Sequence, residues 1–124
     1  MQNRIMYKQY LQAGNFKVMQ IDATRVAGPQ EIVLEYLLAN KFGVRVCPHA
    51  GGVGLCEAVR HFAMFDYLAV SGQWDDRVIE YVDNQHEYFV HPTEIVNGRY
   101  EAPTAPGSGV DMKLEAAERY LYKG

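Results

Sequence analysis

The strongest constraint on the fold is a pattern of a short strand followed by a helix, which recurs along the chain. Residues 16–22 (FKVMQID) are rich in β-forming side chains, and residues 30–43 (QEIVLEYLLANKFG) follow with apolar residues at helical spacing. The pattern repeats in a strand over 44–49 (VRVCPH) and a helix over 54–65 (GLCEAVRHFAMF). This alternation predicts an α/β fold with parallel strands.

A third unit is predicted from residue 67 onward. Residues 67–72 (YLAVSG) are expected to form a strand and residues 76–89 (DRVIEYVDNQHEYF) an amphipathic helix, while residues 1–14 form a lone helix in front. Strand starts near 16, 44 and 67 give a repeat of roughly 25 to 30 residues, typical of βα units. We therefore expect one domain over 1–124, with βα units at about 16–43, 44–66 and 67–91 and a tail over 92–124.

These units look incomplete by themselves. A parallel sheet is normally covered on both faces, and three strands with so few helices cannot achieve that. The expected architecture is the last three or so units of a (β/α)-barrel, which has about 250 residues when whole and an active site at the carboxyl ends of its strands. Asp22, His49 and the pair Ser71–Gly72 fall at those predicted ends. Loops also collect polar residues without any function, so position alone leaves both interpretations open.

Composition argues against several classes of function. The net charge is −3, from 12 basic and 15 acidic residues without long runs, so neither nucleic acid nor a membrane surface is an expected partner. No apolar stretch reaches the roughly 20 residues of a spanning helix, and MQNR does not begin a signal peptide. We expect a cytoplasmic, soluble protein whose two cysteines, Cys47 and Cys56, are reduced.

Two familiar motifs fit this sequence poorly. The stretch GGVGLCE (51–57) follows a strand as a dinucleotide-binding loop does, but Glu57 occupies the place of the third glycine. A zinc site would need unusual spacing, because C-x-H followed by C-x4-H lacks the paired pattern of such sites. The residues concerned are Cys47, His49, Cys56 and His61.

Four segments together resemble one family. They are MQIDATRV, KFGVRVCPHAGGVGLCEAVRHFAMFDYLAVSG, DRVIEYVDNQHEYF and GRYEAPTAPGSGVDM, and they match in order and spacing over nearly the whole chain. The sequence resembles the carboxyl-terminal part of sugar-acid dehydratases of the mandelate racemase group in the enolase superfamily, and L-fuconate dehydratases most closely. The resemblance implies a barrel enzyme that uses Mg²⁺, removes an α-proton beside a carboxylate and expels a β-hydroxyl as water.

The resemblance also implies site residues. His49 would be the base and Asp22, twenty-seven positions earlier, its partner, while Glu80 matches a position that contacts the substrate. Neighbouring strands lie about 4.8 Å apart, so a carboxylate and an imidazole at matching strand ends can form a hydrogen bond, expected at about 2.6 to 3.2 Å. Gln73, Trp74 and Asp75 follow the predicted third strand and are expected at the same rim as substrate contacts.

The resemblance places the remaining machinery outside this sequence. Three acidic magnesium ligands and a lysine acid/base lie on earlier strands in the family, so no metal is expected to be held by this chain alone. The isolated chain is therefore expected to be inactive, because little remains to stabilise the enediolate. The alternative is a stand-alone α/β module that binds a partner chain or a small anion through its glycine loop. Self-association into a homo-oligomer is left open by the sequence.

Overall fold

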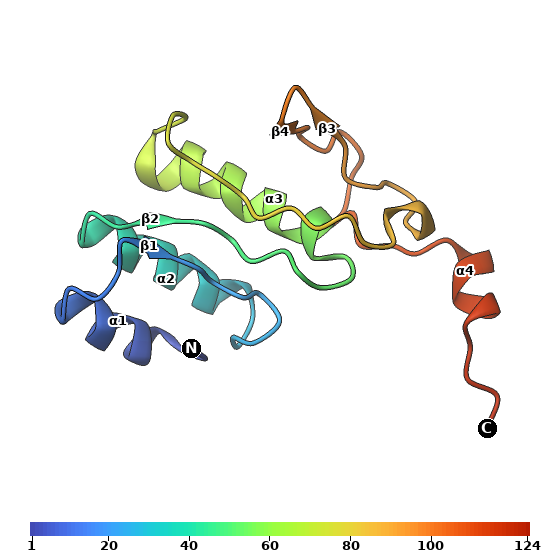
Figure 1. The fold of residues 1–124 in the computed structure, drawn as a ribbon, viewed down its shortest axis with the longest axis horizontal. Coiled ribbons are helices and arrows are strands. Elements are labelled where there is room, and N and C mark those ends of the chain that lie inside the picture. Colours follow the sequence, from blue (N-terminus) through green and yellow to red (C-terminus); the bar gives the residue numbers. More distant parts are fainter.

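The structure is a computed structural model that describes residues 1–124. It has an α/β fold in which short strands alternate with helices in the first half of the chain (Figure 1). In chain order the helices and strands are α1 (Arg4–Gln12), β1 (Val18–Met19), α2 (Pro29–Lys41), β2 (Arg45–Val46), α3 (Leu55–Phe65), β3 (Ile95–Val96), β4 (Arg99–Tyr100) and α4 (Leu114–Arg119). The lone first helix is present, and a strand followed by a helix occurs in each of the first two units predicted, 16–43 and 44–66, with shorter strands than expected.

Strands β1 and β2 form a parallel pair, with Val18 opposite Arg45 and Met19 opposite Val46. Side chains alternate across a strand, so Met19 and Val46 point to the same face, where both are buried. That face packs against α1 and α2 in the main hydrophobic core. The buried residues of this core are Tyr7, Leu11, Met19, Ile21, Ile32, Tyr36, Ala39 and Val46.

Local signals in the sequence explain where the helices begin. The Asn3 side chain accepts a hydrogen bond of 3.0 Å from the Met6 N–H and so caps α1. Pro29 occupies the first turn of α2, where its missing N–H costs nothing. Helix α3 follows Gly54, whose φ of 75° lies in the left-handed region that glycine adopts most readily. This glycine turn therefore joins β2 to α3 within a few residues.

The strand predicted over 67–72 is wrong. Residues Asp66–Ser71 form a π-helical segment that continues α3, and Gly72 ends it with an N–H to Tyr67 C=O hydrogen bond of 3.1 Å. The Ser71 hydroxyl donates to the Asp66 carbonyl at 3.2 Å and stabilises the same turn. A short apolar run such as YLAV fits a buried helix end as well as a strand, and periodicity alone does not separate the two.

The helix predicted over 76–89 is also wrong, because only His86–Tyr88 form a short 3-10 turn. Residues 77–82 run beside β2 instead: the Glu80 N–H donates to the Pro48 carbonyl at 3.2 Å, and Arg45 forms an ion pair with Asp76. Both contacts advance along the two segments together, so they run parallel, and Figure 1 shows this yellow segment returning between α3 and β2. Its β-branched and aromatic residues favour an extended segment.

The tail contains a hairpin that the sequence reading did not predict. Strands β3 and β4 pair antiparallel around Asn97 and Gly98, whose φ values of 52° and 74° are typical of a tight Asn-Gly hairpin turn. Beyond the hairpin the chain returns to α3 and to residues 88–90, where the Val90 N–H donates to the Asp111 carbonyl at 2.9 Å, and then carries α4 outward (Figure 1). None of the helices is long and apolar enough to span a membrane.

Candidate active site

Strands β1 and β2 bring Asp22 and His49 to the same edge. The ladder continues past the strands, since the His49 N–H donates to the Ile21 carbonyl at 2.9 Å. With Val18 opposite Arg45, Asp22 lies in register with His49, four residues further along each segment. The two residues therefore follow neighbouring parallel strands and lie on the same side, as expected.

The His49 imidazole lies between two carboxylates. Its Nδ1 is 2.5 Å from Oε2 of Glu80, whereas its Nε2 is 3.9 Å from Oδ2 of Asp22. A separation of 3.9 Å is too long for a hydrogen bond, so the expected bond to Asp22 is not formed. Glu80, expected to contact substrate, is instead the group in closest contact with the ring.

Other partners account for the position of Asp22. Its Oδ1 accepts hydrogen bonds from the Thr24 N–H at 3.0 Å and the Thr24 hydroxyl at 2.7 Å, and its Oδ2 lies 3.0 Å from Nε of Arg25. Burial alone would raise the pKa of Asp22, but the Thr24 hydrogen bonds and the charges of His49 and Arg25 outweigh it and lower that pKa. Contacts within its own loop therefore hold the Asp22 carboxylate, and the His49 ring lies between Asp22 and Glu80.

Glu80 is fixed by backbone and side-chain contacts. Its Oε2 accepts a hydrogen bond of 2.7 Å from the Ala50 N–H in addition to its contact with His49. The Tyr100 hydroxyl of β4 donates to the Glu80 carbonyl at 2.5 Å. The carboxylate thus bridges the extended segment 77–82 and the loop that carries His49.

Gly51 allows the imidazole to occupy this position. A Cβ atom at residue 51 would lie 2.6 Å from Cε1 of His49, closer than real Cβ atoms approach other atoms, and 3.1 Å from its Nε2. The residue is glycine because the ring packs directly against its backbone.

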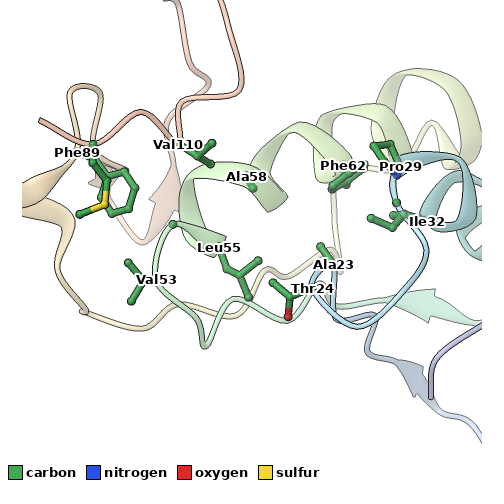
Figure 2. Close-up of a pocket in the computed structure, with 13 residues that line it drawn as sticks. Ala23, Thr24, Pro29, Ile32, Val53, Leu55, Ala58, Phe62, Phe89 and Val110 are labelled. Carbon is green, nitrogen blue, oxygen red and sulfur yellow. The ribbon is translucent and has the colours of Figure 1, made fainter. Parts of the chain in front are cut away.

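An apolar cavity of about 440 Å³ adjoins the site (Figure 2). It lies between the loop after β1 and the start of α3, and Figure 2 shows Phe89 at one end, Pro29 and Ile32 at the other, and Thr24 between them. Because Thr24 both lines this cavity and binds Asp22, the cavity reaches the edge of the His49 site.

Gln73, Trp74 and Asp75 are not brought to His49. Gln73 and Trp74 line a separate cavity of about 660 Å³ that includes none of Asp22, His49 and Glu80. The physical reason is the corrected position of the third extended segment: residues 73–75 precede segment 77–82 and so lie near its amino end, whereas His49 follows the carboxyl end of β2. Their assignment to the rim of this site is not supported by the geometry.

The residues of this chain do not fit a magnesium site by themselves. No group of three or more His, Cys, Asp or Glu side chains is arranged to hold a metal ion. The two carboxylates at His49 already contact nitrogen donors. The four residues of the zinc alternative likewise form no such group.

The sequence reading missed a buried pair formed by Glu57 and His86. Glu57, in the first turn of α3, is completely buried, and its Oε1 accepts a hydrogen bond of 2.7 Å from Nδ1 of His86 and one of 3.0 Å from the Thr93 N–H. A signal was available, because an acidic residue directly beside the apolar positions of a helix needs a partner if it is buried.

Extended parallel segments thus bring an imidazole and two carboxylates to one edge, the edge at which the strands of α/β barrels present their polar residues. Residues 1–117 match the family described as enolase C-terminal domain-like. The chain belongs to this family.

Known proteins resemble the chain over nearly its whole length. Mitochondrial enolase superfamily member 1 of Xenopus laevis is 48% identical over 120 residues, covering 97% of this chain and 27% of that protein. L-galactonate dehydratase of Hypocrea jecorina is 45% identical over 123 residues, covering 99% of this chain and 27% of that protein. The crystal structure of human mitochondrial enolase superfamily member 1 superposes with a TM-score of 0.92 at 45% identity, covering 97% of this chain and 27% of that one. The chain thus spans about a quarter of these relatives.

Proposed function

We propose that this chain supplies the base of a sugar-acid dehydratase, which removes an α-proton and expels a β-hydroxyl to give a 2-keto-3-deoxy acid. The observation that carries the proposal is the His49 imidazole, 2.5 Å from Glu80 and 3.9 Å from Asp22 at one strand edge. L-galactonate is the candidate substrate from the 45% identical relative, and L-fuconate is the candidate from the sequence resemblance.

The geometry suggests which ring nitrogen acts. We propose that the neutral ring carries its proton on Nδ1, the nitrogen that lies 2.5 Å from the Glu80 carboxylate. Nε2 then has a free lone pair and no partner within hydrogen-bonding distance. Nε2 is the atom proposed to take the α-proton, and Glu80 the group that fixes the tautomer.

The two carboxylates also stabilise the protonated His49 ring that this step produces. Once Nε2 has accepted the α-proton, the ring is an imidazolium between the charges of Glu80 and Asp22, which stabilise it. The same proton can pass to the departing β-hydroxyl, so that water leaves and no net proton is consumed. The resulting enol converts to the 2-keto acid.

The remaining requirements lie outside the residues of this chain. The magnesium ion implied by the resemblance would need ligands that this chain does not bring together. We therefore propose that activity belongs to a longer protein in which this chain forms the last part of a barrel. Anion binding by the glycine loop is less well supported, since the Ala50 N–H is already bonded to Glu80.

A chimera tests this proposal. The matching 123-residue region of the Hypocrea jecorina L-galactonate dehydratase is replaced by this chain, and formation of 2-keto acid from L-galactonate and L-fuconate is measured with Mg²⁺. We expect turnover of at least one of these acids by the chimera. A chimera that folds like the parent enzyme and converts no sugar acid would contradict the proposal.

A further inference from the structure

We propose that Glu57 and His86 form a positioning pair that holds Glu80 against His49. This inference rests on the proposed function, because it concerns the geometry of the same site. Neither residue touches His49. They act through the segment that carries His49 and the segment that carries Glu80.

Glu57 links α3 to the chain that follows Glu80. Its side chain is completely buried, and Oε1 binds both Nδ1 of His86 at 2.7 Å and the Thr93 N–H at 3.0 Å. Arg60, one turn later on α3, donates to the carbonyls of Glu57 and His91. The start of α3 therefore holds residues 86–93 at three points.

His86 is charged in this arrangement. Its Nε2 lies 2.9 Å from the Val82 carbonyl, which only accepts, so both ring nitrogens must carry protons. Burial lowers the pKa of His86, but the hydrogen bonds to Glu57 and Val82 and the charges of Glu57 and Asp83 outweigh it and raise that pKa. The ring also stacks on Tyr81 with an interplanar angle of 11°. The contact is thus a buried ion pair.

The Glu57–His86 pair controls the distance between the segment that joins His49 to α3 and the segment that joins Glu80 to His86. Helix α3 begins six residues after His49, and His86 lies six residues after Glu80. His86 binds the carbonyl of Val82, two residues from Glu80, and the Cys56 thiol approaches the same carbonyl at 3.7 Å. With Glu57 buried and unable to move into solvent, His86 and Val82 are drawn toward α3, and Glu80 is presented to His49.

Amide hydrogen exchange in the chimera with L-galactonate dehydratase tests the proposal, with the Ala50 N–H as the reporter. That N–H is bonded to the Glu80 carboxylate, so its protection measures whether Glu80 stays in place. The variants Glu57→Gln and His86→Gln remove the ion pair from either side with side chains of similar size. The exposed neighbour Glu87→Gln is the matched control.

We expect the Ala50 amide to exchange at least about tenfold faster in both variants, with the Cys47 and His49 amides of the β1–β2 ladder unchanged. Unchanged exchange at Ala50 would overturn the inference. Equal acceleration of all three amides would overturn it too, by showing that the pair only supports the fold, and so would an unprotected Ala50 in the unsubstituted chimera. Exchange requires no catalysis, so this result is independent of the dehydratase assignment.

Discussion

At the residue scale, the position of His49 depends on the absence of a side chain at residue 51. In Gly51→Ala the new Cβ would lie 2.6 Å from Cε1 of His49, so the ring must move away from Glu80. Misplacement of a catalytic group by about 1 Å can cost about 100-fold in rate, and we expect a loss of that size in 2-keto acid formation by the chimera. Gly52→Ala is the control, because its Cβ meets only the Leu55 side chain, with Cδ1 at 3.0 Å and Cγ at 3.3 Å, and does not touch His49.

A second residue-scale prediction concerns Glu35 of α2. Both carboxylate oxygens are buried without a hydrogen-bond partner, and burial together with the charge of Glu31 raises the pKa of Glu35 to about 7. The folded state therefore keeps a proton that the unfolded chain releases near pH 4.5. The contribution of this proton to the free energy of unfolding is fully present below pH 4.5 and is lost as the pH rises through 7.

We expect Glu35→Gln to remove this pH dependence. At pH 8 the substitution should raise the free energy of unfolding by up to about 3 kcal/mol more than it does at pH 4. The figure follows from the rise in the pKa of Glu35 from 4.5 to about 7, at about 1.36 kcal/mol per pKa unit. Urea unfolding followed by circular dichroism at the two pH values measures it. Glu115→Gln, on the exposed face of α4, should show no such difference, and equal pH profiles for Glu35→Gln and the unsubstituted chain would refute the prediction.

At the scale of elements, two buried tyrosines show how the helices pack on the strands. The Tyr7 hydroxyl of α1 donates to the Gln20 carbonyl at 2.9 Å, whereas the buried Tyr36 hydroxyl of α2 has no partner. Tyr7→Phe should lower the free energy of unfolding by about 1 kcal/mol, and Tyr36→Phe should leave it unchanged or raise it by up to about 1 kcal/mol. Denaturant unfolding of the two variants compares them directly, and a larger loss for Tyr36→Phe would contradict this account.

The elements also show how much the sequence could predict. Strands β1 and β2 and helices α1 to α3 were predictable, because each has a clear period or a cap such as Asn3 or Pro29. The two errors share one cause: residues 67–72 and 76–89 each contain a short apolar run whose period fits either element. Their neighbours decide the outcome, since α3 continues into the first segment and the second runs beside β2 and Pro48.

Part of the candidate site was predictable from the sequence and part was not. The shared edge of Asp22 and His49 follows from strand alternation, which the sequence contains. The contact between Glu80 and His49 was not predictable, because it depends on segment 77–82 running beside β2, with the Glu80 N–H bonded to the Pro48 carbonyl. The Glu57–His86 pair joins residues 29 positions apart, and no local pattern specifies such a contact.

At the scale of the whole molecule, the chain leaves much apolar surface uncovered. Large side chains such as Ile5, Leu68 and Trp74 are 60%, 78% and 56% exposed, and the β1–β2 pair has free edges. We expect the isolated chain to self-associate or to be partly molten, because exposed apolar patches and strand edges favour association. Sedimentation and calorimetry test this prediction. A monomer with one sharp unfolding transition would contradict it and would favour a stand-alone module.

The isolated chain should also be inactive with Mg²⁺, because its residues form no metal site. Formation of 2-keto acid from L-fuconate or L-galactonate by the purified chain tests this prediction. Turnover by the chain that His49→Ala abolishes would show that the residues outside it are not required.

The most direct test of the central claim compares the chimera with its His49→Asn variant. Asparagine retains a polar side chain in the loop but cannot take up a proton, so we expect 2-keto acid formation to fall at least about 100-fold, the usual contribution of a general base. The circular dichroism spectrum and unfolding midpoint of the variant should match those of the chimera. A His49→Asn chimera that converts the sugar acid at the unsubstituted rate would contradict the assignment of His49 as the base.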